Sequence, residues 1–276
     1  MLNNLTKRIL TALVVYIVVA YIILFSNEII LRLTLNFIIF FSAFEISKMC
    51  FYPNKKKSFF FICLVFILVT FSNILIKNQI WQFYILISSI LWIYIFFYIY
   101  YLKEIKIYKN FNYIILFIIA FLLSSFYCAI YKLYLFSNIT LLFLISLVCL
   151  SDIVAYFSGK SFGKNPFFNM ISPNKTREGF IGSLLICSVF SLLFSYWHDS
   201  SYYYTILNML ISIFVVCVSA FGDLSISLIK RFSGVKDSGN ILPGHGGLLD
   251  RIDSLLPASP IFLLLFSAVL LLFDII

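Results

Sequence analysis

The chain has 276 residues, of which 63% are hydrophobic and 11% are charged. Soluble domains carry about a quarter charged residues, so this composition excludes that class and indicates an integral membrane protein. The net charge of +9 does not predict a nucleic-acid partner, because the positions of the basic residues follow membrane topology, as described below. The six cysteines occur singly, which predicts neither a disulfide framework nor a zinc site.

Runs of about 17–25 apolar residues are long enough to cross a bilayer as helices, and nine such runs follow one another along the chain. We therefore predict an all-α, polytopic membrane protein, because helices satisfy the backbone in lipid and the sequence shows no alternating strands. The first two runs lie close together and also fit a re-entrant pair. In chain order, the expected spans are 9–25, 29–47, 58–76, 81–102, 113–135, 138–159, 179–197, 205–229 and 255–273.

Basic residues set the expected orientation of these spans. With a cytoplasmic N-terminus, nine spans place all of the 20 Lys and Arg residues in cytoplasmic segments except Arg32, Lys77 and Lys132. This excess follows the positive-inside rule, so we predict a cytoplasmic N-terminus and a C-terminus outside. The first apolar run shows no cleavage site and is expected to be retained as a helix. The lack of a targeting segment favours a bacterial inner (plasma) membrane, with the site facing the cytoplasm.

Glycine divides the chain into two parts. All ten glycines lie at or after Gly159, and glycine permits tight turns and a close approach of backbone to ligand. We predict that residues 1–137 form a scaffold of transmembrane helices and that residues 138–276 form the catalytic region, within one membrane domain. In the scaffold, Glu45 and Arg32 lie in or near apolar spans, and the sequence leaves open whether they pair with lipid headgroups or with each other.

Four carboxylates are expected at one membrane level. Asp152 lies in the inner half of the sixth span, Asp223 lies near the cytoplasmic end of the eighth, and Asp250 and Asp253 precede the ninth. The last two share a face if their segment is helical. Converging carboxylates repel one another unless a cation lies among them, and Mg²⁺ fits that role together with substrate phosphates. The alternative is that each acid pairs with a lysine or lies at a helix start.

Basic and glycine residues surround the last two of these acids. Lys230, Arg231, Lys236 and Arg251 are candidates to hold phosphates. In the loop between them, Gly246 and Gly247 follow His245 directly, and backbone N–H groups at such glycines can face an anion. The alternative is an ordinary Pro-Gly turn before a helix. His245 itself fits a phosphate contact or a purely structural role.

A second cluster lies between the sixth and seventh spans. Asp152 and Tyr156 share a helix face there. Lys175 and Arg177 follow in the next loop, which is a candidate clamp for a triphosphate, and Thr176 between them is a candidate cap for the next helix. Pro173 is expected to fix a turn. The alternative is that the lysines of this loop only set the topology.

These residues carry a resemblance. The segment 227–253, SLIKRFSGVKDSGNILPGHGGLLDRID, resembles the signature of the phosphatidate cytidylyltransferase family, whose members are also called CDP-diacylglycerol synthases. The segment 151–179, with its SPNKTREG run, and Asp223 within GDLSISLIKR are similar to that family as well. Strong similarity covers roughly 151–253, whereas the N-terminal half matches mainly in its hydropathy.

The resemblance implies an activity and its partners. A nine-helix membrane enzyme, expected to be a homodimer, would transfer the cytidylyl group of CTP to phosphatidate, releasing pyrophosphate and forming CDP-diacylglycerol for phospholipid biosynthesis. The phosphatidate phosphate is the nucleophile and is already anionic, so charge neutralisation and in-line positioning are needed more than a strong base. The acyl chains would stay among the membrane lipids.

The resemblance also implies a metal centre and a set of site residues. Asp223 and Asp250 are the first choice as Mg²⁺ ligands, with Asp253 close by, and a monovalent cation such as K⁺ would share the site. The expected catalytic residues are Asp223, Asp250, Asp253, Lys230, Arg231, Lys236 and His245. The expected substrate-binding residues are Asp152, Tyr156, Lys175, Thr176, Arg177, Asp237, Gly246, Gly247 and Arg251.

Three other functions are compatible with parts of this pattern. A transporter or channel also contains buried acids, but these acids gather at one membrane face instead of lining a path. A CTP-dependent polyprenol or lipid kinase would share parts of this layout and would release CDP instead of pyrophosphate. A CDP-alcohol phosphotransferase is disfavoured because its DGxxAR…GxxxD…D pattern is absent from the sequence.

Overall fold

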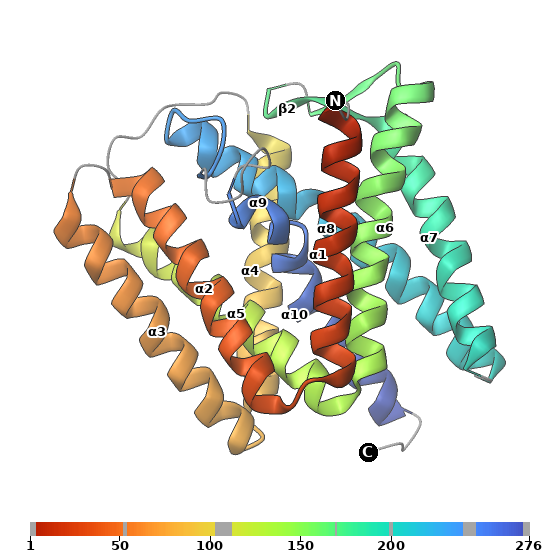
Figure 1. Cartoon of the computed structure of the whole chain (residues 1–276), viewed down its shortest axis with the longest axis horizontal. Coiled ribbons are helices and arrows are strands. Elements are labelled where there is room, and N and C mark those ends of the chain that lie inside the picture. Colours follow the sequence, from red (N-terminus) through yellow and green to blue (C-terminus); the bar gives the residue numbers. More distant parts are fainter. Residues whose placement is uncertain are drawn as a thin grey trace.

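The computed structural model describes residues 4–51, 54–102, 112–168, 170–198, 201–239 and 247–272. These residues form helices with one small sheet between α6 and α7 (Figure 1). The helices are α1 (Asn4–Phe25), α2 (Glu28–Phe51), α3 (Lys55–Lys77), α4 (Trp81–Tyr101), α5 (Tyr113–Phe136), α6 (Asn138–Phe162), α7 (Arg177–Trp197), α8 (Tyr202–Phe232), α9 (Leu249–Ile252) and α10 (Leu255–Leu272). The strands are β1 (Pro166–Phe168) and β2 (Ser172–Thr176).

The all-α membrane class predicted from the sequence is confirmed. Among the described residues, 8 helices are long and apolar enough to cross a bilayer, the last of them running through α9 and α10 as Leu249–Leu271. The remaining expected span coincides with α1, a helix of 22 residues that includes the apolar stretch Leu13–Phe25. The orientation of the helices in the membrane stays a prediction.

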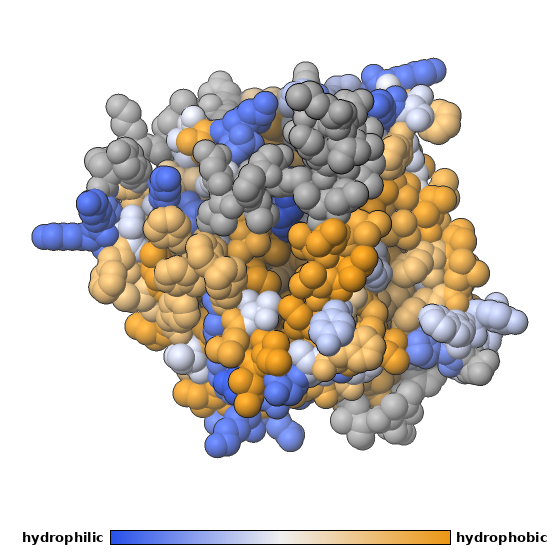
Figure 2. All heavy atoms as spheres, in the orientation of Figure 1, coloured by the Kyte–Doolittle hydropathy of each residue, from blue (hydrophilic) through white to orange (hydrophobic). Residues whose placement is uncertain are grey.

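Large apolar side chains cover much of the outside of the molecule. Phe59 on α3, Phe83 and Ile90 on α4, and Leu185 on α7 are all more than half exposed. Figure 2 shows this apolar surface around the middle of the molecule, with polar residues gathered towards its two ends. Such a surface suits lipid, because the hydrocarbon of a bilayer covers apolar side chains that water would disfavour.

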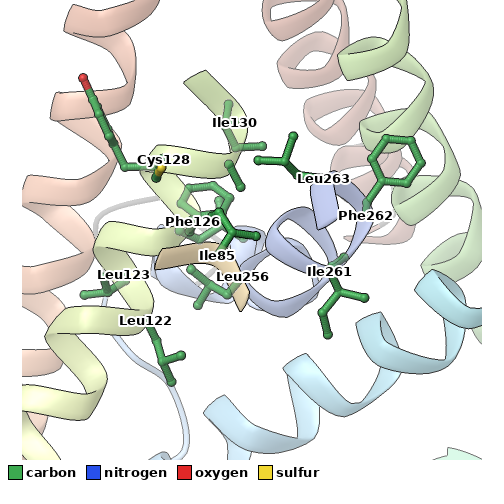
Figure 3. Close-up of a cluster of buried hydrophobic side chains, with 14 of the residues drawn as sticks. Ile85, Leu122, Leu123, Phe126, Cys128, Ile130, Leu256, Ile261, Phe262 and Leu263 are labelled. Carbon is green, nitrogen blue, oxygen red and sulfur yellow. The ribbon is translucent and has the colours of Figure 1, made fainter. Parts of the chain in front are cut away.

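The core lies where α4, α5 and α10 meet. Figure 3 shows Ile85 of α4 beside Phe126 of α5 and Leu256 of α10, and all three are buried. Most of α5 is buried, which makes it the central helix of the bundle. Helices α8 and α10 also pack on each other, so this core fixes the segment that carries the predicted catalytic acids.

Glycine brings α6 and α7 into close contact. A Cβ atom added at Gly179 of α7 would lie 2.5 Å from the backbone oxygen of Ala155 and 3.2 Å from Cα of Gly159, both on α6. One turn further along α7, a Cβ atom at Gly182 would lie 2.5 Å from the hydroxyl of Ser158. Small residues let membrane helices approach closely, since van der Waals packing drives helix association in lipid.

The small sheet was not predicted from the sequence. Strands β1 and β2 pair antiparallel, with Pro166 opposite Thr176 and Phe168 opposite Ser172. Pro173 therefore lies within β2 and not at a turn. In Figure 1 the hairpin lies at the same end of the molecule as the N-terminal end of α1, and the described chain finishes near the opposite end.

Candidate active site

Three of the predicted carboxylates gather between α6, α8 and the end of α9. Asp253 is buried and lies within interaction range of Asp223 on α8 and of Asp152 on α6. The hydroxyl of Ser254 links the group by donating to Oδ1 of Asp152 at 3.4 Å. Carboxylates this close need a cation or a shared proton between them, because like charges repel strongly at low dielectric.

A glycine on α8 explains how Asp223 and Asp253 come together. A Cβ atom added at Gly222 would lie 2.5 Å from the backbone oxygen of Asp253 and 2.6 Å from Cγ of Pro257. Only a residue without a side chain lets these two backbones approach so closely. Gly222 therefore sets the distance between the acid that follows it in α8 and the acid that follows α9.

Lys175 brings a positive charge to this acidic group. Its Nζ atom lies 2.5 Å from Oδ2 of Asp223 and 3.4 Å from the backbone oxygen of Ala220. The side chains of Lys175 and Asp223 are 30% and 29% exposed, so the ion pair is accessible to a charged substrate. On the other side, Ser227 donates to Oδ1 of Asp223 at 3.3 Å.

Aromatic packing holds the hairpin that carries Lys175. The rings of Phe167 and Phe168 each lie 5.9 Å from the ring of Phe221, centroid to centroid. Phe96 of α4 contacts the same ring edge-on at 4.1 Å. Aromatic pairs at these separations add stability beyond their buried area. Because Phe221 precedes Asp223 by two residues on α8, the packing places β2 beside the acid that Lys175 contacts.

Hydrogen bonds of Thr176 and Glu178 fix the end of β2 and the start of α7. The hydroxyl of Thr176 accepts a hydrogen bond from the backbone N–H of Gly179 at 3.1 Å, so Thr176 caps α7 as predicted. Glu178 accepts from the backbone N–H groups of Lys164 and Asn165 at 3.1 and 3.3 Å, and from the side-chain amide of Asn165 at 2.9 Å. These bonds tie the start of α7 to the loop that follows α6.

Asp250 belongs to a different group of contacts. Its Oδ1 atom lies 2.8 Å from Nζ of Lys230, near the end of α8. Its Oδ2 atom accepts from the backbone N–H of Gly247 at 3.2 Å and from the hydroxyl of Ser238 at 3.0 Å. The expected shared face of Asp250 and Asp253 is therefore split, because one carboxylate turns towards Lys230 and the other towards Asp223.

Both groups of contacts include an acid of the segment 227–253, Asp253 in the first group and Asp250 in the second. A profile of the cytidylyltransferase family matches residues 6–269, nearly the whole chain. The chain belongs to the cytidylyltransferase family. The matched residues include both halves of the chain, so the family assignment covers the N-terminal helices as well as the acidic site.

Relatives within this family carry a more specific name. The chain is 42% identical over 129 residues to the phosphatidate cytidylyltransferase of Haemophilus influenzae, a match covering 44% of this chain and 43% of the relative. It is 41% identical over 149 residues to that of Aquifex aeolicus, covering 52% and 55%. It is 48% identical over 110 residues to that of Bacillus subtilis, covering 40% of each. The matches thus span about half the length of these relatives.

Most of the other predicted site residues of this family member lie in the described part of the chain. Tyr156 is exposed on α6 and its ring contacts Phe157. Arg177 begins α7 and its backbone N–H donates to the backbone oxygen of Asn165 at 3.0 Å. Arg231 ends the basic pair on α8. Lys236, Asp237 and Arg251 are exposed. His245 and Gly246 lie outside the described residues.

Sequence reasoning missed two residues of the site, Glu45 and Ser238. Glu45 on α2 is buried and accepts from the hydroxyl of Ser238 at 3.1 Å, while that hydroxyl also faces Asp250. The signal for Glu45 was its charge within an apolar span, which marks a functional position by default. Its partner was not visible, because the two residues are far apart in the chain. Arg32, its possible partner in the sequence, instead pairs with Glu28 at 3.7 Å.

Across residues 4–272, leaving out the undescribed gaps, no three Asp, Glu, His or Cys side chains are grouped closely enough to form a complete metal site of their own. Mg²⁺ in nucleotide enzymes takes one or two carboxylates and completes its shell with substrate phosphates and water. The paired carboxylates of Asp223 and Asp253 match that limited requirement. Together with Lys175 and Lys230, they form a site suited to polyphosphate.

Proposed function

We propose that this chain transfers the cytidylyl group of CTP to phosphatidate, giving CDP-diacylglycerol and pyrophosphate. The observation that carries the proposal is the pairing of Lys175 with Asp223 beside Asp152 and Asp253, in a membrane protein of the cytidylyltransferase family. Relatives at 41–48% identity bear the name phosphatidate cytidylyltransferase. A lipid substrate accounts for the placement of such a site inside a helical membrane bundle.

The reaction needs charge neutralisation above all. An oxygen of the phosphatidate phosphate attacks the α-phosphorus of CTP, a new P–O bond forms, and the bond from the α-phosphorus to the bridging oxygen breaks to release pyrophosphate. The attacking oxygen is already anionic, so it needs no strong base. Lys175 and Lys230 neutralise phosphate oxygens, and cations fixed in this way stabilise the charge that develops in the transition state.

Metal ions belong to the proposal. Asp223, Asp250 and Asp253 were predicted as Mg²⁺ ligands, and the close approach of the Asp253 backbone to Gly222, directly before Asp223, supports the pair Asp223 and Asp253. Bound Mg²⁺ would supply electrostatic stabilisation of the phosphates. Asp250 stays a predicted ligand, although Lys230, Ser238 and Gly247 already occupy its oxygens. A role for K⁺, a homodimer, and a site facing the cytoplasm of a bacterial cell remain further parts of the proposal.

The experiment uses the purified full chain in detergent with phosphatidate, Mg²⁺ and CTP labelled at either the α- or the γ-phosphate. The proposal predicts that the α-label enters lipid and that the γ-label is released as pyrophosphate. A γ-label in the lipid, with release of CDP, would establish a lipid kinase instead. No labelled lipid from either CTP, while the relative from Bacillus subtilis is active in parallel, would refute transfer to phosphatidate.

A further inference from the structure

Glu45 connects the N-terminal half of the chain to the signature segment. It lies on α2 and is 2% exposed. Its Oε1 atom accepts from the backbone N–H of Leu248 at 2.9 Å, and its Oε2 atom accepts from the backbone N–H of Leu249 at 2.8 Å. The carboxylate thus holds both residues at the start of α9, directly before Asp250. Such charge-assisted hydrogen bonds are shorter and stronger than those between neutral groups.

Ser238 extends this connection to Asp250. Its hydroxyl lies 3.1 Å from Oε2 of Glu45 and 3.0 Å from Oδ2 of Asp250. A hydroxyl has a single proton, so it donates to one of these carboxylates at a time. The backbone N–H of Ser238 also donates to Asp250, at 3.3 Å. If a change at Glu45 shifts Ser238, the hydrogen bonds from Ser238 to Asp250 shift as well.

The same carboxylate accounts for two glycines of the signature. A Cβ atom added at Gly239 would lie 2.7 Å from Oε1 of Glu45. One added at Gly247 would lie 2.5 and 2.6 Å from the two carboxylate oxygens and would also overlap the hydroxyl of Ser238. Side chains at these positions would expel Glu45 from its place, so the glycines keep the backbone close to it.

We propose that Glu45 is a positioning residue for cytidylyl transfer, which orients Asp250 and its partner Lys230 through Ser238 and the backbone at Leu248 and Leu249. This inference rests on the proposed function for its kinetic consequence but not for its structural one. A helix that the sequence places in the scaffold thereby fixes the geometry of the site. Glu45 on α2 holds the backbone before α9, and that backbone positions Asp250 for its ion pair with Lys230.

The structural test is amide hydrogen exchange in the full chain in detergent, comparing wild type with Glu45→Gln. The amide replacement keeps the size of the side chain, but it removes the charge and turns one acceptor into a donor facing an N–H group. Loss of a hydrogen bond to a charged group predicts exchange at Leu248 and Leu249 faster by about tenfold or more. Exchange in α5 should stay the same in Glu45→Gln. Glu28→Gln, on the same helix, is the control for loss of a carboxylate from α2 and should leave exchange at Leu248 and Leu249 unchanged.

The kinetic test measures transfer from CTP by Glu45→Gln, by Ser238→Ala and by the double variant. A positioning role predicts that kcat falls by about tenfold in Glu45→Gln while KM for CTP changes less, because Glu45 itself touches no substrate. The double variant should lose no more than the more damaging single change, since both act on Asp250 along one route. Additive losses, or unchanged kcat, would refute the positioning role.

A variant that does not fold and a wild-type chain without transfer activity lead to different conclusions. If Glu45→Gln fails to fold, Glu45→Asp takes its place in both tests, because it keeps the charge but is too short to reach both N–H groups. An intermediate loss is then expected, and a wild-type rate would refute the role. If the wild-type chain transfers no cytidylyl group, the proposed function fails, and hydrogen exchange alone decides whether Glu45 holds the segment: unchanged exchange at Leu248 and Leu249 would overturn it.

Discussion

The Nζ atom of Lys175 on β2 lies 2.5 Å from Oδ2 of Asp223 on α8. This contact joins the hairpin between α6 and α7 to the acidic group beneath it. The pair is about 30% exposed, so water screens part of its attraction and its contribution to folding is small. Its significance lies in the proposed function, in which the ammonium group beside this carboxylate would bind a phosphate of CTP.

The first prediction concerns this lysine. Lys175→Met keeps the length of the side chain but removes its charge, so we expect kcat/KM for CTP to fall by about ten- to a hundredfold, the range for a lost charged hydrogen bond. Steady-state kinetics in detergent measure it. Lys77→Met, at the exposed end of α3, is the matched control and should retain the wild-type rate. Equal values of kcat/KM for CTP in the two variants would show that Lys175 does not belong to the site.

The second prediction concerns the ion pair between Lys230 and Asp250, whose side chains are 12% and 15% exposed. Lys230→Met leaves Asp250 without its cation in a mostly buried place, which costs roughly 3 kcal/mol or more. We expect the melting temperature in detergent to fall by several degrees. Adding Asp250→Asn should restore part of that loss, because the unpaired charge is then gone. A double variant less stable than Lys230→Met would contradict this account.

The third prediction separates two kinds of steric obstacle between α6 and α7. Gly179→Ala places its new Cβ atom against the backbone of Ala155, and Gly182→Ala places one against the side chain of Ser158. Both variants should melt at a lower temperature, since overpacking typically costs about 1–3 kcal/mol. Only Gly182→Ala should recover when Ser158→Gly is added. Rescue of Gly179→Ala by the same change would show that the helices do not pack as described.

The fourth prediction tests the expected orientation. The six cysteines are free, so they can be replaced before single cysteines are introduced at Lys77 and at Asn174, both exposed. In intact cells, a membrane-impermeant maleimide should label the first and not the second, because the positive-inside rule places Asn174 in the cytoplasm. Asn174 should react only after the membrane is opened. The reverse pattern would invert the topology.

Much of the helical arrangement follows from the sequence, because long apolar runs report directly on membrane-spanning helices. The cap at Thr176 was also predictable, since capping depends on residues three positions apart. The hairpin was not. Pro173 suggested a turn, whereas aromatic packing of Phe167 and Phe168 on Phe221 stabilises strands at this place.

The site itself was predicted in its residues more than in its contacts. The i, i+3 spacing put Asp250 and Asp253 on one face, but α9 ends at Ile252 and the two carboxylates reach different partners. Glu45 escaped assignment because its partners lie in a segment distant along the chain, and no local pattern encodes such a contact. The division into a scaffold at 1–137 and a catalytic region at 138–276 stays a prediction, and Glu45 is one of the residues that link the two.

The central claim is that the acidic group around Asp223 carries the transfer of the cytidylyl group. The most direct measurement is the initial rate at which α-labelled CTP labels phosphatidate, for wild type, Asp223→Asn and Glu28→Gln. We predict a loss of about a hundredfold or more in Asp223→Asn, the scale for removing one group that stabilises charge in a transition state, and a rate near wild type in Glu28→Gln. A wild-type rate in Asp223→Asn would contradict the account.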